Sequence, residues 1–134
     1  MLKKLFADKI LLTKVFLYLV AIHSFFVGMA LIFFPSNLMV LFYFSAITEP
    51  FFKAQGGVFH LVMVVAYIIA AIDPVGNLKF IIFAIITKLI ATVFLITYFL
   101  LHTSMVTVFL SGVGDFIMAV ILYLLFDNMK KQIT

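Results

Sequence analysis

The sequence FIIFAIITKLIATVFLIT, residues 80–97, decides the fold, because it is apolar on both sides of a single lysine, Lys88. The next apolar stretch, residues 106–126, also carries one charge near its middle, the acid Asp115. Placing a lone charge at the middle of a membrane costs about 2.5–3.5 kcal/mol on insertion scales. Two opposite charges on neighbouring helices therefore indicate a pair that faces the inside of a helical bundle.

The composition of the whole chain is that of a membrane protein. Hydrophobic residues make up 67% of it and charged residues 10%, whereas soluble domains average about 45–50% apolar and about 25% charged residues. A membrane-spanning helix needs about 20 apolar residues, so 134 residues have room for four such helices and little else. We predict an all-α integral membrane four-helix bundle, with residues 1–134 forming a single transmembrane domain.

Proline and polar clusters divide the chain into four predicted spans, at about residues 13–34, 51–72, 78–101 and 105–126. Two shorter segments are predicted to lie at the membrane surface. Residues 1–14 mix lysines with apolar residues and are expected to form an amphipathic, uncleaved start. Residues 38–47 are apolar but too short to span, which indicates an interfacial or re-entrant segment.

The positions of the lysines predict the orientation of the bundle. Lysines precede the first span, follow the turn between the second and third, and follow the fourth, which places them all on one side. The positive-inside rule then puts both termini in the cytoplasm. Lys53 is the one lysine expected near the opposite side.

The missing residue types and motifs exclude several kinds of site. Without cysteine the chain has no disulfide, thiolate metal site or iron–sulfur cluster. Without arginine it has no bidentate phosphate clamp, and its net charge of +4 lies mainly at the ends of the chain, so no nucleic-acid partner is expected. No catalytic or metal-binding motif is present, which favours a protein that is not an enzyme.

Several ionisable groups are expected at one depth of the membrane. His23, Lys88 and Asp115 lie within about two residues of the midpoints of their predicted helices, and His60 lies slightly nearer the outer side. Such groups face a bundle interior or a wet cavity. The candidate ligand-binding residues or polar core are therefore Lys88, Asp115, His23, His60 and Gln55, with Gln55 at the mouth of the pocket.

The Lys88–Asp115 pair is open to three interpretations. It is a structural ion pair that fixes which helices touch, a proton or ligand site, or a pair of which at least one member faces a partner protein.

The two histidines are also open to more than one interpretation. A histidine on an apolar helix most often bonds a neighbouring hydroxyl or carbonyl group. His23 and His60 can also be the two axial ligands of a b-type haem, with Gly28, Gly56 and Gly57 leaving room for the ring.

Two short motifs resemble a known family. Gln55-Gly56-Gly57 near the start of the second predicted span and Asp73-Pro74 at its end resemble the small four-helix bacterial membrane proteins of the DoxX-like and BphX-like group. The resemblance implies four spans in the inner membrane of a bacterium, and some members of that group resemble accessory subunits of quinol-oxidising or redox systems. An acidic residue often stands where this chain has Gln55, so no catalytic residue is carried over.

Three functions follow as hypotheses. The first is an accessory subunit or a module that binds a lipid- or quinone-type small molecule, within a larger membrane complex or a homo-oligomer. The second is a small oligomeric proton-coupled transporter that uses Lys88, Asp115 and His60 as its polar path. The third is a haem b protein with His23 and His60 as ligands.

Overall fold

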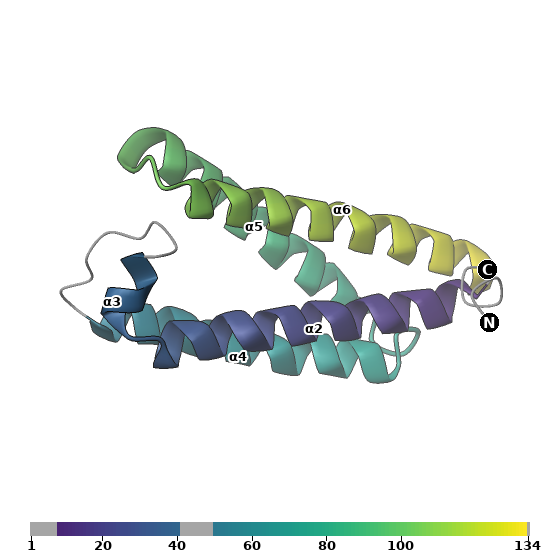
Figure 1. Ribbon diagram of the computed structural model, residues 1–134. Helices are drawn as coiled ribbons and strands as arrows, with labels where there is room; N and C mark the ends of the chain where they lie inside the picture. The colour runs from purple at the N-terminus through teal and green to yellow at the C-terminus, as the bar shows by residue number, and fades with distance from the viewer. Residues whose placement is uncertain (1–7, 41–49, 134) are drawn as a thin grey trace.

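The protein is a small helical membrane protein. The computed structural model describes residues 8–40 and 50–133, and its regular elements in these ranges are all helices (Figure 1), which confirms the predicted fold class. Four helices are long and apolar enough to cross a membrane. They are α2 (Lys9–Phe33), α4 (Pro50–Ile72), α5 (Leu78–His102) and α6 (Val106–Ile133), and a short α3 (Ser36–Met39) follows α2.

The first spanning helix begins earlier than predicted. α2 starts at Lys9 instead of residue 13, because the side chain of Asp8 accepts a hydrogen bond from the backbone N–H of Leu11 at 3.1 Å and so caps the helix. Residues 9–14 of the segment that was expected to lie on the membrane surface therefore belong to the spanning helix. Residues 1–7 lie outside the described part of the chain.

The last helix ends later than predicted. α6 continues past Phe126 to Ile133, where the sequence indicated only a polar end. Proline and glycine are absent from these final turns, and Lys131 pairs with Asp127 one turn earlier at 2.6 Å. Lys130 and Lys131 also lie in the last turn, where positive charge is favourable to the helix dipole.

The expected interfacial segment between the first two spans is only partly described. α3 covers its start, and residues 41–49 lie outside the described ranges. The other connections are tight. In the α4–α5 turn the Asp73 carboxylate accepts from the backbone N–H of Gly76 at 3.0 Å, and the Asn77 amide donates to the Ile69 carbonyl at 3.1 Å.

Two helical hairpins, α2–α4 and α5–α6, form the bundle, because each helix packs most closely on its partner in the same hairpin. Glycine allows this close approach. A Cβ atom on Gly28 would lie 2.8 Å from the carbonyl oxygen of Gly57, and one on Gly57 would lie 2.6 Å from that of Gly28. Gly112 meets Ile96 of α5 in the same way, with 2.9 Å between a built Cβ and the isoleucine side chain.

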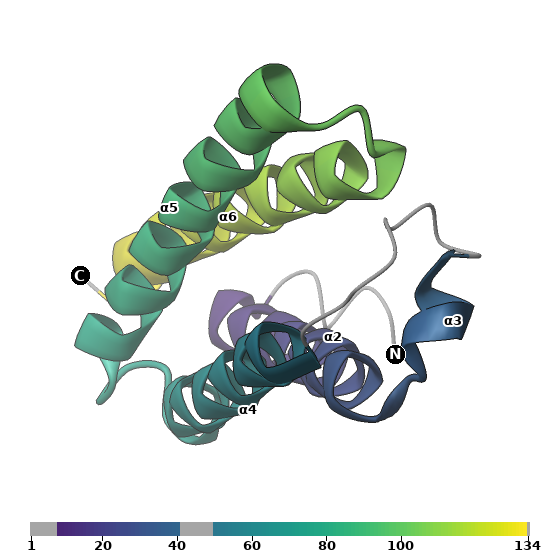
Figure 2. The same cartoon turned by 90° about the vertical axis from the view of Figure 1, so that its left-hand side faces the viewer.

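The two hairpins pack against each other mainly at one end. The terminal end is the end where α2 begins and α6 finishes, and the opposite end holds α3 and the α5–α6 turn (Figure 1). The buried hydrophobic cluster lies in the terminal half of every spanning helix, and its members include Leu17, Val20, Ala70, Ala71, Ile81, Ala84, Leu122 and Met129. Towards the opposite end the hairpins spread apart (Figure 2).

Two lysines form hydrogen bonds between the ends of α2 and α4. Lys14, near the start of α2, donates to the carbonyl of Ile72 at the end of α4, at 3.4 Å. Lys53, near the start of α4, donates to the carbonyl of Phe34 just after α2. The last carbonyls of a helix lack partners within it and favour positive charge, so Lys53 has a structural role that the distribution of lysines did not indicate.

The glycine contact in the α2–α4 hairpin gives a test of the packing. Gly57→Ala is expected to lower the free energy of unfolding in mild detergent by about 1–3 kcal/mol, because the new methyl group overlaps the backbone of α2. Gly56→Ala is the matched control, since its methyl group meets only Leu31 at 3.9 Å. Equal stability of the two variants would contradict the close approach.

Candidate ligand site between the two hairpins

The ion pair of Lys88 and Asp115 lies at the centre of the candidate site. Its atoms Nζ and Oδ1 are 2.5 Å apart. The side chains of Lys88 and Asp115 are 4% and 13% exposed, so the ion pair is almost fully buried within the protein. Because Lys88 is on α5 and Asp115 on α6, the pair joins the two helices of one hairpin, as the short turn between them allows.

Tyr67 connects this pair to the other hairpin. Its ring on α4 is 2% exposed, and the ammonium of Lys88 lies 5.9 Å from the ring centre. A cation over an aromatic face at this distance is attracted to it. Tyr67 was not among the candidate residues predicted from the sequence, although it lies seven residues after His60 and so shares its helix face.

A cavity of about 430 Å³ opens beside the pair. It lies largely between α2 and α6, and we call it the α2–α6 cavity. Its polar lining consists of His23, His60, Thr107, Ser111 and Asp115. Its other lining residues are Val27, Leu31, Leu95, Val108, Leu110, Gly114 and Met118, and they come from the middle and the opposite end of the helices. The separation of the hairpins at that end accounts for its position.

A second, smaller cavity reaches the same pair from the other side. It has a volume of about 210 Å³, and we call it the α4–α5 cavity because most of its lining comes from these helices. Lys88, Tyr67 and Thr87 border it, together with His60 and Asp115. His60 and Asp115 therefore border both cavities, which places them at the boundary between the two.

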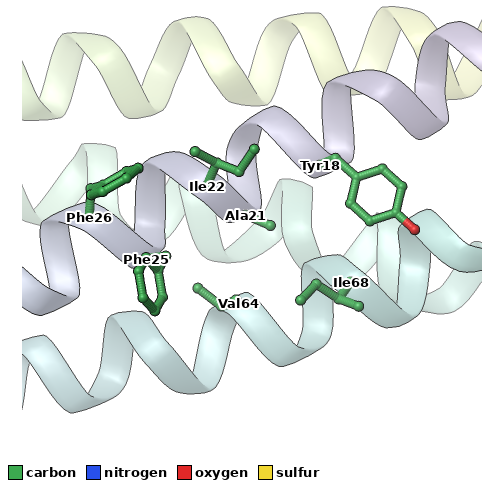
Figure 3. Close-up of a pocket in the computed structure, with 7 residues that line it drawn as sticks. All are labelled: Tyr18, Ala21, Ile22, Phe25, Phe26, Val64 and Ile68. Atoms are coloured by element: carbon green, nitrogen blue, oxygen red, sulfur yellow. The ribbon is translucent and has the colours of Figure 1, made fainter.

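A third cavity, of about 470 Å³, has a different character. It is a groove between α2 and α4, and Figure 3 shows it lined by aromatic and aliphatic side chains. The hydroxyl group of Tyr18 is the one side-chain polar atom among these lining residues. This groove suits a hydrocarbon chain of the bilayer and offers no chemistry, so it is not the candidate site.

Four of the five candidate residues come together, and the fifth does not. Lys88, Asp115, His23 and His60 all border one or both of the two polar cavities. Gln55 is exposed and borders neither. Five residues separate it from His60 on α4, which turns its side chain by about 140° around the helix axis. The expected place of Gln55 at the pocket mouth therefore stays a prediction.

Two of the three glycines that were expected to leave room for a haem ring lie at a helix contact. Gly28 and Gly57 are buried where the backbones of α2 and α4 touch, and neither borders the two polar cavities. Gly56 borders the α4–α5 cavity together with His60. Among the described residues no three metal-ligating side chains (His, Cys, Asp or Glu) gather in one place.

Ser24 is a further polar residue at this depth. It is 1% exposed, and its hydroxyl group lies near that of Tyr67 without forming a hydrogen bond of good geometry. Thr87 and Thr92 differ from Ser24 because their hydroxyl groups bond to backbone carbonyls. These threonines donate to the carbonyls of Ala84 at 3.0 Å and Lys88 at 2.8 Å.

Comparisons with known proteins found no match to this chain among family models, curated proteins or solved structures. The resemblance to the DoxX-like and BphX-like group therefore stays an expectation from two short motifs. What the site does has to be argued from its own geometry.

The buried pair gives the second test. Asp115→Asn alone is expected to cost about 3–5 kcal/mol of unfolding free energy in detergent, because it leaves the buried ammonium of Lys88 without its counter-charge. The double variant with Lys88→Met and Asp115→Leu is expected to lose less, since no charge then remains buried. Lys131→Gln, which breaks the exposed pair with Asp127, is the control and is expected to leave stability unchanged. Equal losses in the single and double variants would show that the two side chains do not act as a pair.

Proposed function

We propose that the protein is a binding module for a lipid- or quinone-type small molecule in a bacterial inner membrane, with both termini in the cytoplasm. The α2–α6 cavity supports this proposal most strongly. Most of its lining is apolar, and its polar lining residues include Asp115, His23 and His60. Ligand sites have this composition of mostly apolar lining with a few polar groups, and volumes of about 300–1,000 Å³.

The position of the cavity, beside an exposed residue on the outer surface of the bundle, favours a ligand that enters from the bilayer. Leu110, at the end of the cavity away from the ion pair, is 60% exposed on the outer surface of the bundle. A molecule dissolved in the membrane can therefore reach the cavity between α2 and α6 without passing through water. Its polar head would lie by the ion pair and its tail against Val27, Leu31 and Leu110.

An accessory role in a larger membrane assembly is part of the same proposal. Many large apolar side chains of the four spans are exposed, for example Phe26, Ile90 and Leu124. Another membrane protein can pack on such a surface as lipid does. A module that holds a membrane-soluble molecule could then present it to a partner that carries out chemistry.

Proton-coupled transport is the second candidate, and the two cavities favour it. His60 and Asp115 border both of them, so a proton on either residue can be reached from two sides. The packed terminal half of the bundle opposes it, because the buried cluster there fills the space through which a substrate would have to leave. Loss of proton-driven flux from proteoliposomes in the Asp115→Asn variant would favour transport over binding alone.

Tryptophan fluorescence tests the binding site directly, because the chain has no tryptophan of its own. Leu110→Trp places a reporter at the cavity, and Leu124→Trp places one on the exposed surface of the same helix in the terminal half. A short-tailed benzoquinone that quenches tryptophan is expected to quench the first reporter saturably. It is expected to quench the second only in proportion to its concentration in the membrane.

Gly114→Leu supplies the matched variant for this experiment. A Cβ atom on Gly114 would meet nothing within 4 Å, so the larger side chain enters the cavity without a clash. Saturable quenching is expected to disappear in this variant and to survive Val120→Leu, which alters an exposed position on the same helix. Linear quenching at both reporters would overturn the proposed function.

A further inference from the structure

One carboxylate oxygen of Asp115 is left for a ligand. Oδ1 accepts from Lys88, and no other side chain among the described residues bonds to this carboxylate. Asp115 borders both polar cavities. Its second oxygen, Oδ2, is not among the fully buried atoms of the described residues that lack a partner, so it remains accessible to a ligand. An ionised carboxylate can only accept hydrogen bonds. A ligand that satisfies Oδ2 must therefore donate one.

The charge of the site limits the ligand further. The charges of Lys88 and Asp115 neutralise each other, and both side chains are nearly buried. A charged head group would add a third charge without a counter-charge, and an uncompensated charge at this depth is costly. The other polar groups of the α2–α6 cavity, such as His23, His60 and Ser111, can donate or accept without any net charge. The site therefore suits a neutral head.

We infer that the ligand is a neutral amphiphile whose head carries a hydroxyl group, which donates a hydrogen bond to Oδ2 of Asp115. The inference rests on the proposed function and narrows it to one chemical class. A hydroxyl group also accepts, so its oxygen can receive a hydrogen bond from His60 or His23 in the same cavity. An ether in the same position would set an acceptor against an acceptor and leave both unsatisfied.

Two pairs of compounds that differ only in the donor test the inference. 4-Octylphenol and its methyl ether 4-octylanisole have an aromatic head, and 1-dodecanol and dodecyl methyl ether have an aliphatic one. Each is titrated against the benzoquinone bound to the Leu110→Trp variant, and recovery of fluorescence reports displacement. The alcohol of a pair is expected to displace the quinone at a concentration roughly tenfold lower than its ether, as a hydrogen bond to a charged group implies.

The results for the two pairs show which kind of hydroxyl compound binds, and they also show whether a hydroxyl group is needed at all. A preference in the phenol pair alone would assign an aromatic hydroxyl, as in a quinol, and a preference in both pairs would include aliphatic hydroxyl lipids. Equal potency within both pairs would overturn the inference while leaving the proposed function standing. Quinone quenching that never saturates would overturn the proposed function instead.

A variant shows whether Asp115 is the acceptor. The double variant with Lys88→Met and Asp115→Leu removes the carboxylate without leaving a buried ammonium. Its affinity for the quinone is expected to change, and the ratio of alcohol to ether potency within each pair is expected to fall from about tenfold to about one. A preference that persists in this variant would place the acceptor elsewhere and overturn the assignment to Asp115.

Discussion

The buried ion pair between Lys88 and Asp115 is the interaction on which the arrangement of the site depends. Either charge alone would add to the free-energy cost of placing its helix in the membrane. Pairing at 2.5 Å on adjacent helices offsets much of this cost. The pair fixes the rotation of α5 against α6, and with it the direction in which both helices present their polar groups. Tyr67 extends this constraint to the α2–α4 hairpin through its contact with the ammonium.

Close packing and open space occur in different halves of the same bundle. Glycine brings the helices of each hairpin together at Gly28, Gly57 and Gly112, while the hairpins share a packed core only in their terminal half. The polar cavities lie where this core ends, with the ion pair at the boundary. A rigid base with an open region next to it is suited to holding a small molecule at a fixed depth.

The sequence predicted the elements of the fold more completely than their packing. Pro35, Pro50 and Pro74 interrupt the apolar runs, and the ends of the helices beside them agree with the prediction to within one residue. The missed ends, at Lys9 and Ile133, depend on a capping side chain and a lysine–aspartate pair instead of a change in hydropathy. Such local interactions have weaker signatures than proline.

The sequence predicted how deep in the membrane the site residues lie, but not which cavities they border. Counting residues along each helix places His23, His60, Lys88 and Asp115 near one level, because helix rise is constant. Gln55 borders neither of the two polar cavities. Helical periodicity shows which residues share a face without showing what that face meets. The separation of the hairpins beside the α2–α6 cavity (Figure 1) depends on how four helices pack together, which the periodicity of one helix does not show.

The most direct test of the central claim is a solid-state NMR measurement of the contact between the Lys88 ammonium nitrogen and the Asp115 carboxylate carbon in lipid bilayers. Lysine Nζ is labelled with ¹⁵N and aspartate Cγ with ¹³C, and the Asp127→Asn background removes the second lysine–aspartate salt bridge given for residues 8–40 and 50–133. The account predicts a strong coupling that disappears on Lys88→Met. Absence of that coupling in the otherwise unchanged protein would contradict it.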